Sequence, residues 1–232
     1  MWEWMLAPID LGRAHDVAPL VAWHGRVMTL AWGIMVPLGV LAARYFKVLP
    51  GQDWPRQLDN QVWWVTHRVM QYGAVALTLL GLFLILQDRQ DHAGSTIHRL
   101  LGYTILVIAA LQVTGGLLRG GKGGPTDRTG GASDHFEMTR RRIAFEVIHK
   151  ALGYSALLLT VSTVVTGLWL ANAPHWMWLA MAVWWSVLLT VAILLQRRGM
   201  ALDTYQAIWG PDPELPGNRM TPIGIGIARR RG

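Results

Sequence analysis

The chain has 232 residues, of which 52% are hydrophobic, a mean hydropathy of +0.29 and a formal charge of +7. Its apolar residues are gathered in long blocks, which is typical of a membrane protein rather than of a soluble domain. The absence of cysteine excludes disulfides, cysteine-ligated iron–sulfur clusters, thiolate zinc sites and covalently attached c-type haem. Any metal site must therefore use histidine, methionine or oxygen ligands.

The first residues, MWEWMLAPIDLGRAHD, are acidic and lack the basic start and the small-residue cleavage site of a secretory signal. We therefore expect the first apolar block to remain in the mature protein. Residues 1–21 are then predicted to form an external N-terminal segment.

Five apolar blocks are each long enough to cross a hydrocarbon core of about 30 Å as a helix. Pro37 lies in the first block, between Gly33 and Gly39, where neighbouring helices can satisfy a kinked backbone. The blocks cover residues 22–45, 63–87, 98–118, 145–171 and 176–196. The sequence thus predicts an all-α integral membrane protein with five transmembrane helices: a four-helix core over 22–171, a fifth helix within 172–196 and a tail over 197–232.

The basic residues are distributed unevenly between the two sides that five spans define. Only four of the 21 lie on the N-terminal side, and they are Arg13, Arg26, Arg89 and Arg99. The positive-inside rule then predicts a protein of the cell (inner) membrane with a periplasmic N-terminus and a cytoplasmic C-terminus. The net charge is therefore read as a topology signal, and we expect no nucleic-acid partner.

Two polar segments fall on the predicted cytoplasmic side. Residues 119–142 are glycine-rich and basic, but Lys122 is followed by glycine and lies between two helical blocks, unlike a phosphate-binding loop. We expect a flexible linker there. The tail is rich in proline and glycine, and we expect it to lie along the surface or to dock onto a partner.

Four histidines stand at the starts of the first four spans: His24, His67, His98 and His149. Two of them open similar stretches, HRLLGY at 98–103 and HKALGY at 149–154. Spans one and three start on the external side, and spans two and four on the cytoplasmic side. The span order therefore predicts two pairs, His24 with His98 and His67 with His149.

A pair of histidines on facing helices of a bundle can hold a metal cofactor. Zinc requires three or four ligands, whereas two imidazoles suffice for the axial positions of a haem, whose ring supplies four nitrogens. Because two axial histidines leave no open position for O2, such a site favours electron transfer. The sequence predicts two b-type haems in the four-helix core, one near each membrane face.

The residues around these histidines agree with that hypothesis. Gly102 and Gly153 follow a histidine by four residues, on the same helix face, where a missing side chain leaves room for a flat macrocycle. A basic residue follows each histidine by one or two positions and is placed to pair with haem propionates. These residues are Arg26, Arg68, Arg99 and Lys150.

Ordinary structural roles remain open for all of these residues. Histidines near helix ends often cap the helix or lie at the interface, glycines serve helix packing, and Arg and Lys extend toward water. The other histidines lie outside the spans and are expected at the surface: His15, His92, His135 and His175. Of these, His92 is the nearest rival as a ligand because it precedes His98 by six residues.

In combination, these motifs resemble the cytochrome b561 family, in particular the branch found in bacteria and fused to DOMON domains in eukaryotes. The resemblance covers roughly residues 20–170. It rests on HGRVMTLAWGIMVPLGVLAARY (24–45), WWVTHRVMQYG (63–73), HRLLGY with Gln112 (98–112) and FEVIHKALGY (145–154).

The resemblance implies transmembrane electron transfer through two b haems, one per leaflet, with His24, His67, His98 and His149 as their ligands. The chain departs from the ascorbate-using animal and plant members, which have six spans, and it has no clear counterpart of their ascorbate-site motifs. We see no DOMON or other soluble redox domain. The external donor or acceptor is therefore expected to be a separate molecule or subunit.

Three functional hypotheses remain open, and in each of them the chain lies in a membrane and contacts its lipids. The chain is an electron-transfer protein between a redox donor and an acceptor protein or a quinone. Alternatively, it is an oxidoreductase with its own quinol or ferric-chelate site, for which Gln71, Gln112 and Arg44 are candidate polar groups. In the third, it is a subunit that assembles or anchors a larger complex or a homodimer. The sequence does not decide whether the chain is itself an enzyme.

Overall fold

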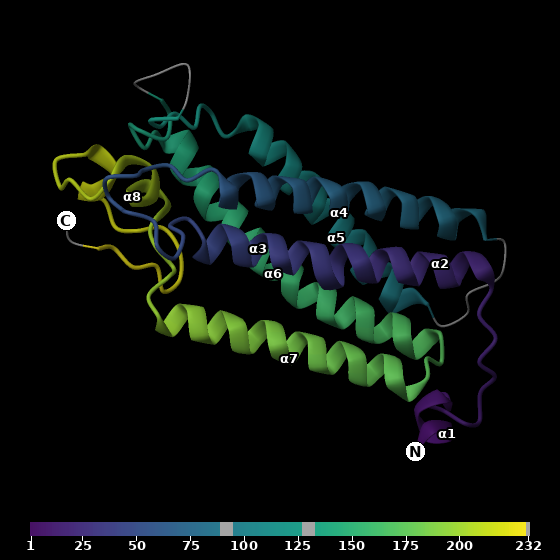
Figure 1. Ribbon diagram of the computed structural model, residues 1–232. Coiled ribbons are helices and arrows are strands. Elements are labelled where there is room, and N and C mark those ends of the chain that lie inside the picture. Colours follow the sequence, from purple (N-terminus) through teal and green to yellow (C-terminus); the bar gives the residue numbers. More distant parts are fainter. Residues whose placement is uncertain (89–94, 127–132, 231–232) are drawn as a thin grey trace. The chain divides into compact units, whose positions relative to one another are not determined.

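The computed structural model describes residues 1–88, 95–126 and 133–230, and these residues form an all-helical protein (Figure 1). The predictions for Arg89, His92 and residues 127–132 of the linker fall outside these ranges. Five helices in the described part are long and apolar enough to cross a membrane, as the sequence predicts. They are Pro19–Tyr45, which comprises α2 (Pro19–Met28), η1 (Thr29–Met35) and α3 (Val36–Tyr45), followed by α4 (Val62–Gln87), α5 (Thr96–Leu118), α6 (Arg140–Leu170) and α7 (His175–Arg197).

The α6 helix begins five residues before the predicted span. Thr139 lies just outside the helix, and its hydroxyl accepts a hydrogen bond from the Arg142 backbone N–H at 3.3 Å. This contact satisfies one of the free donors at a helix start. A hydropathy block marks only the apolar part of a helix, so the charged first turn of α6 lay beyond it.

The irregularity predicted at Pro37 takes the form of a π-helical segment, η1, which ends two residues before the proline. Proline has no N–H and cannot bond the carbonyl four residues earlier, which is that of Gly33. The indole N–H of Trp184 on α7 donates to this carbonyl at 2.7 Å. A neighbouring helix therefore satisfies the freed backbone group, as the sequence leads us to expect.

The chain divides into two compact units, each built from parts of several helices. Unit 1 comprises 1–37, 70–109 and 155–191, and unit 2 comprises 38–69, 110–154 and 192–232. In unit 1 the short helix α1 (Trp2–Leu6) lies at the start of α7 (Figure 1). Trp32 and Thr78 are buried in this unit, and the indole N–H donates to the hydroxyl at 2.9 Å.

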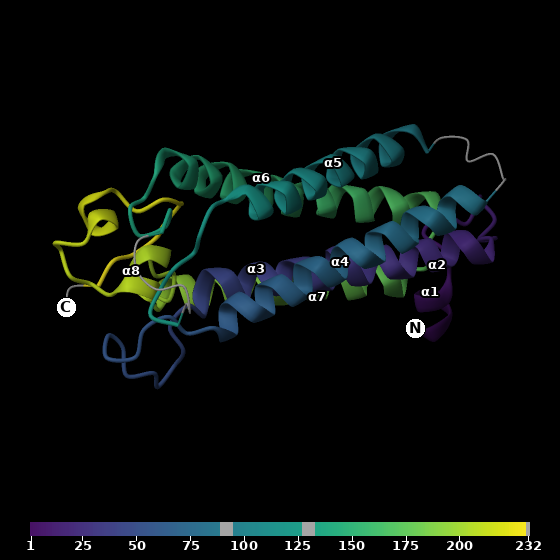
Figure 2. The ribbon, with the colours of Figure 1, turned by 90° about the horizontal axis from the view of Figure 1, so that it is seen from above.

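Unit 2 is capped by its own polar segments, which include α8 (Thr204–Trp209) and a 3-10 turn, η2 (Pro216–Arg219). Figures 1 and 2 show α8 and the yellow segment that follows it gathered at one end of this unit. The tail does not lie loosely on the surface, because Leu202, Tyr205 and Ile208 are almost fully buried. The prediction of a surface-lying tail is therefore wrong for residues 201–208, which pack within the chain itself, whereas Ile225 further along the tail is 76% exposed. Docking of the tail onto a partner stays a prediction.

The prediction of a flexible linker over 119–142 is also wrong for the described residues of that segment. The Lys122 ammonium donates to the carboxylate of Asp59 at 2.6 Å, and the Asp59 side chain is fully buried. Gly123 and Gly124 have positive φ angles of 62° and 115°, which glycine adopts without strain. The glycines therefore shape an ordered turn around a buried carboxylate.

Candidate functional site

In unit 1, His24 on α2 and His98 on α5 face each other. Their ring centroids lie 6.3 Å apart, with ring planes at 78°. The His24 Nδ1 lies 2.8 Å from the carbonyl oxygen of Gly81, and the His98 Nδ1 lies 3.1 Å from that of Thr163. Because a carbonyl only accepts hydrogen bonds, each Nδ1 must carry the proton. Each Nε2 is then left with a lone pair for a metal.

In unit 2, His67 on α4 and His149 on α6 form a second pair with nearly the same geometry. Their ring centroids lie 6.2 Å apart, with ring planes at 76°. The His67 Nδ1 lies 3.0 Å from the carbonyl oxygen of Gly39. The His149 Nδ1 is buried and has no hydrogen-bond partner among the residues described. Phe145 lies against this ring instead, with centroids 4.9 Å apart.

The spacing of both pairs fits one metal atom between two imidazoles. A zinc–imidazole bond of about 2.0–2.1 Å, with each ring centre about 1.1 Å behind its nitrogen, gives roughly 6.3 Å between centres on opposite sides of a metal. The described ranges contain no group of three or more His, Cys, Asp or Glu placed to hold an ion. A two-histidine site therefore suits a cofactor that brings its own equatorial ligands, as haem does.

The two glycines expected to admit a macrocycle differ in their surroundings. A Cβ at Gly102 would meet nothing within 4 Å, so that side of α5 is open in unit 1. A Cβ at Gly153 would lie 3.2 Å from Nε2 of Gln112. Gly153 thus makes room for the Gln112 side chain, whose amide donates to the His149 carbonyl at 3.0 Å.

The four basic residues predicted to pair with propionates are also placed differently. Arg26, Arg68 and Arg99 are exposed. Lys150 is partly buried, and its ammonium already bonds the Glu146 carboxylate at 2.7 Å and the Ile223 carbonyl at 2.8 Å. The propionate role of the four residues remains a prediction.

Arg119 is a cation near the unit 2 pair that the sequence analysis did not select. Its guanidinium lies 4.2 Å from the ring centroid of Trp64, and that of Arg68 lies 5.6 Å from the same indole. Trp64 and Arg68 lie close to His67 in the sequence, so two cations contact one aromatic ring near this pair. Arg119 directly follows the last residue of α5, and that position was the only signal for it in the sequence.

The polar groups considered for a quinone site are engaged with the chain itself. The Gln71 amide donates to the Val36 carbonyl at 3.2 Å, and the Gln112 amide bonds the His149 carbonyl as described. The Arg44 guanidinium donates to the Tyr154 hydroxyl, and also to Gln196 Oε1 at 2.9 Å and the Ile225 carbonyl at 2.7 Å. These contacts support structural roles for the three side chains.

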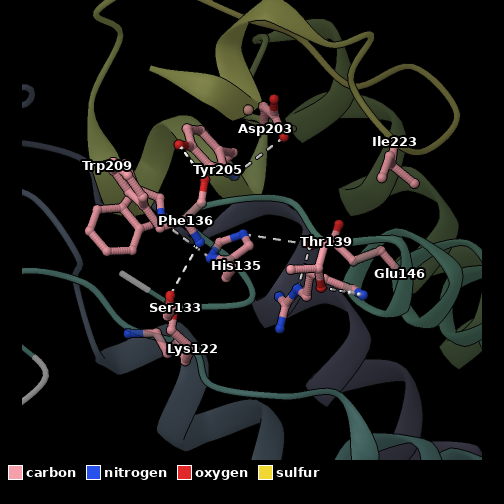
Figure 3. Close-up of polar contacts among 12 residues, drawn as sticks. Lys122, Ser133, His135, Phe136, Thr139, Glu146, Asp203, Tyr205, Trp209 and Ile223 are labelled. Atoms are coloured by element: carbon pink, nitrogen blue, oxygen red, sulfur yellow. Dashed lines mark hydrogen bonds and ion pairs between the residues drawn. The ribbon is translucent and has the colours of Figure 1, made fainter. Parts of the chain in front are cut away.

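His135 contradicts the expectation of a surface histidine, because it is completely buried in unit 2 (Figure 3). The indole N–H of Trp209 donates to its Nδ1 at 3.3 Å, so the proton of the neutral ring is on Nε2. That nitrogen lies 3.6 Å from the Glu146 carboxylate. Burial, reinforced by the Arg142 charge, lowers the pKa of His135 to about 3, so this contact is not an ion pair at neutral pH.

Of the two other described histidines expected at the surface, His15 is exposed and His175 is partly buried. Each bonds a backbone carbonyl in unit 1, those of Ala171 and Ala7 respectively.

Glu146 and Lys47 form the charged centre of the cap of unit 2. The Glu146 carboxylate is buried and accepts hydrogen bonds from Arg142 at 3.1 Å and Lys150 at 2.7 Å. Lys47 is also buried, and its ammonium donates to the Leu202 carbonyl at 2.9 Å. Burial, together with the nearby Lys150 charge, lowers the pKa of Lys47 to about 7.

Five apolar helices define a multi-span membrane protein, in which two pairs of histidines lie with their rings about 6 Å apart. Sequence similarity to known proteins identifies the kind of membrane protein more closely. A cytochrome b561, DM13 and DOMON domain-containing protein of Arabidopsis thaliana is 29% identical over 153 residues, which is 66% of this chain and 15% of that protein. Ferric-chelate reductase 1 of Bos taurus is 30% identical over 165 residues, covering 69% of this chain and 24% of that protein. A putative ferric-chelate reductase 1 homolog of Drosophila melanogaster is 26% identical over 206 residues, or 85% of this chain and 29% of that protein.

Over about two thirds of its length, this multi-span membrane protein is homologous to cytochrome b561-domain proteins, and the homology implies haem b as its cofactor. It spans only part of these curated relatives, 15% of the Arabidopsis thaliana protein and 24% of the Bos taurus ferric-chelate reductase 1. No family model and no solved structure matches the chain.

Proposed function

We propose that this protein carries electrons across a membrane through two b-type haems, one held by His24 and His98 and the other by His67 and His149. The observation that carries the proposal is the spacing of the two ring pairs, 6.3 Å and 6.2 Å between centroids. The similarity to cytochrome b561-domain proteins supports the same function.

The haems would supply one-electron Fe(III)/Fe(II) chemistry, and the protein's contribution is to hold and orient their axial ligands. The carbonyls of Gly81, Gly39 and Thr163 fix three of the imidazoles in the tautomer that presents Nε2. Phe145 packs against the fourth imidazole, that of His149. Two histidines would hold each haem, and a site with two histidine ligands favours electron passage over O2 binding.

The decisive measurement is haem content per chain, from a pyridine haemochrome assay, in the wild type and in single alanine variants. His98→Ala removes a ligand of the unit 1 pair, and His149→Ala removes one of the unit 2 pair. His15→Ala is the matched control, because His15 is exposed and belongs to neither pair. We expect two haems in the wild type and the control, and one haem in each of the other two variants.

The outcomes separate the ligand assignment from the function. If either pair variant retains both haems, the assignment of that pair is wrong. If folded wild-type protein made with haem available contains none, electron transfer through haem fails altogether.

A ferric chelate is the acceptor class that the relatives suggest, because several of them are named ferric-chelate reductases. In such a reaction, a chelated Fe(III) would take up one electron and become Fe(II), and a reduced haem held by the histidine pairs would supply that electron and become oxidised. Mixing dithionite-reduced protein, freed of excess dithionite, with Fe(III)-citrate tests this step. Reoxidation of the haem with one Fe(II) formed per electron supports it, and haem that stays reduced contradicts it.

We further propose that the C-terminal side faces the cytoplasm of a cell with an inner membrane. Of the 21 Lys and Arg residues, four fall in the sequence ranges of unit 1 and seventeen in those of unit 2, which supports the positive-inside assignment. Because the chain has no cysteine, an Arg56→Cys variant provides a unique label. A membrane-impermeant maleimide should label it only after the cells are opened, and labelling of intact cells would reverse the orientation.

A further inference from the structure

The N-terminal segment of unit 1, residues 2–11, exposes large apolar side chains although it is held firmly in place. Trp2 is 77% exposed, Leu6 is 65% exposed and Leu11 is 82% exposed. Single exposed apolar residues are common and need no explanation. Several of them on one short ordered segment instead indicate a surface that something covers.

The segment is fixed by Asn172, which lies in the turn between α6 and α7. Asn172 is buried, and its φ of 46° is a left-handed conformation that asparagine tolerates better than most residues. Its side-chain oxygen accepts from the Asp10 backbone N–H at 3.0 Å. Its amide nitrogen donates to the carbonyls of Asp10 at 2.9 Å and Arg13 at 2.8 Å. One buried side chain therefore holds the backbone of the N-terminal bend, residues 10–13, at both of its ends.

Further contacts tie the same segment to the ends of both helices. The Arg13 guanidinium donates to the Trp169 carbonyl at 2.8 Å and lies 4.7 Å from the Trp169 ring centroid. At the start of α7, the His175 backbone N–H donates to the Ala7 carbonyl at 3.1 Å. The His175 ring lies 4.2 Å from that of Trp4. The exposure of the apolar side chains therefore belongs to a docked segment rather than to a loose end.

The position of this segment is set by the helices that it caps. Each of α6 and α7 is long enough to span the hydrocarbon core, so the turn between them must lie near the membrane surface. The exposed surface of α7 begins with Trp176 and continues through Leu179 and Val183, which face lipid in a spanning helix. The N-terminal segment contacts His175, the first residue of α7, through Ala7 and Trp4, so its exposed apolar side chains lie near the end of this surface.

The chemistry of the segment suits the interface rather than the hydrocarbon interior. Tryptophan is enriched at this depth because its ring is apolar and its N–H is polar. The one acidic group in the bend, Asp10, is neutralised by Arg13 at 3.1 Å and also accepts from the Gly12 backbone N–H at 2.9 Å. Glu3 and Asp16 are exposed and free to face the headgroups or water.

From these observations we infer that residues 2–11 form an interfacial anchor, which lies in the plane of the bilayer surface and inserts Trp2, Leu6 and Leu11 at the boundary of headgroups and acyl chains. The occupant of this surface is lipid. Through its hydrogen bonds to Asp10 and Arg13, Asn172 connects this anchor to the turn that precedes α7. This inference rests on the membrane character of the chain and not on the haem assignment.

Site-directed spin labelling tests the anchor in the full chain. Leu6→Cys and Leu11→Cys variants are labelled with a nitroxide in nanodiscs of phosphatidylcholine and phosphatidylglycerol, and the chain has no other cysteine to react. Collision rates with O2, which concentrates in lipid, are compared with those of a polar nickel chelate. Val183→Cys on α7 is the lipid-facing control, and Arg56→Cys, whose arginine side chain is 86% exposed, is the water-facing control.

We expect the ratio of O2 to nickel collisions at positions 6 and 11 to exceed that at position 56 and to approach that at position 183. A ratio equal to that at position 56 places the segment in water and overturns the inference. Low collision rates with both reagents also overturn it, because they indicate that protein, and not lipid, covers positions 6 and 11. Since no haem enters the readout, the test keeps its meaning even if the haem assignment fails.

Discussion

Changing Glu146 to glutamine tests whether a buried carboxylate holds the cap of unit 2 together. The carboxylate accepts from Arg142 at 3.1 Å and from Lys150 at 2.7 Å, and Lys150 in turn donates to the tail at Ile223. Glutamine keeps the size of the side chain and removes its charge. Two cations that are wholly or partly buried, Arg142 and Lys150, would then lose the only acidic group that bonds either of them within the described chain.

The magnitude follows from the burial of the pair. Removing one partner of a buried ion pair costs about 3–5 kcal/mol. Because a glutamine oxygen can still accept one hydrogen bond, we take the lower end of that range. About 3 kcal/mol corresponds to an increase of roughly a hundredfold in the opening of the cap, since each 1.4 kcal/mol is a factor of ten.

The assay is amide hydrogen exchange of residues 221–230 in detergent-solubilised protein, followed by mass spectrometry. Glu214→Gln is the matched control, because Glu214 pairs with Arg219 in the same unit but both side chains are largely exposed. An exposed pair contributes about 0–1 kcal/mol, so the control should exchange like the wild type. If Glu146→Gln exchanges no faster than Glu214→Gln, the carboxylate does not hold the tail and the reasoning is refuted.

Three further predictions concern the buried groups of the two units. Burial lowers the pKa of Lys47 from 10.5 to about 7 in the folded protein, so between these pH values the unfolded chain binds one more proton than the folded chain. The free energy of unfolding should therefore increase between pH 7 and pH 10.5, by on the order of 4 kcal/mol, and Lys47→Met should abolish this contribution; an equal pH dependence in both proteins would contradict it. Thr78→Val removes the acceptor of the buried Trp32 indole and should cost about 1–3 kcal/mol in thermal unfolding, most of which Trp32→Phe in the same chain should restore. The haem that remains in the His98→Ala variant should have a higher reduction potential than the haem that remains in His149→Ala, because His149 has no Nδ1 acceptor among the described residues and most of the chain's cations fall in unit 2. A redox titration showing the reverse order would refute this explanation.

The sequence alone determined the five spanning helices and the repeated placement of histidine at the starts of four of them. Hydrophobic blocks of this length have few alternatives in a membrane, where the backbone must satisfy its own hydrogen bonds. The absence of cysteine narrowed the possible ligands to histidine, methionine and oxygen. Span order also predicted which histidines share a membrane face, and the rings of those same residues lie about 6 Å apart.

Tertiary structure alone decided the partners of those histidines. Nothing in the sequence marks the carbonyls of Gly39, Gly81 and Thr163 as acceptors, because every residue offers a carbonyl and only helix packing selects one. The same holds for Gly153, which admits a glutamine side chain rather than an open space.

The two polar segments show most clearly that the sequence alone does not reveal which side chains are buried. Residues 119–142 and the tail have the composition of loops, yet they bury Asp59, His135 and Tyr205 in unit 2. Composition measures how strongly a segment prefers water, whereas burial depends on whether each polar group finds a partner. Those partners come from distant parts of the chain, as when the Trp209 indole reaches His135, and the fold alone brings them together.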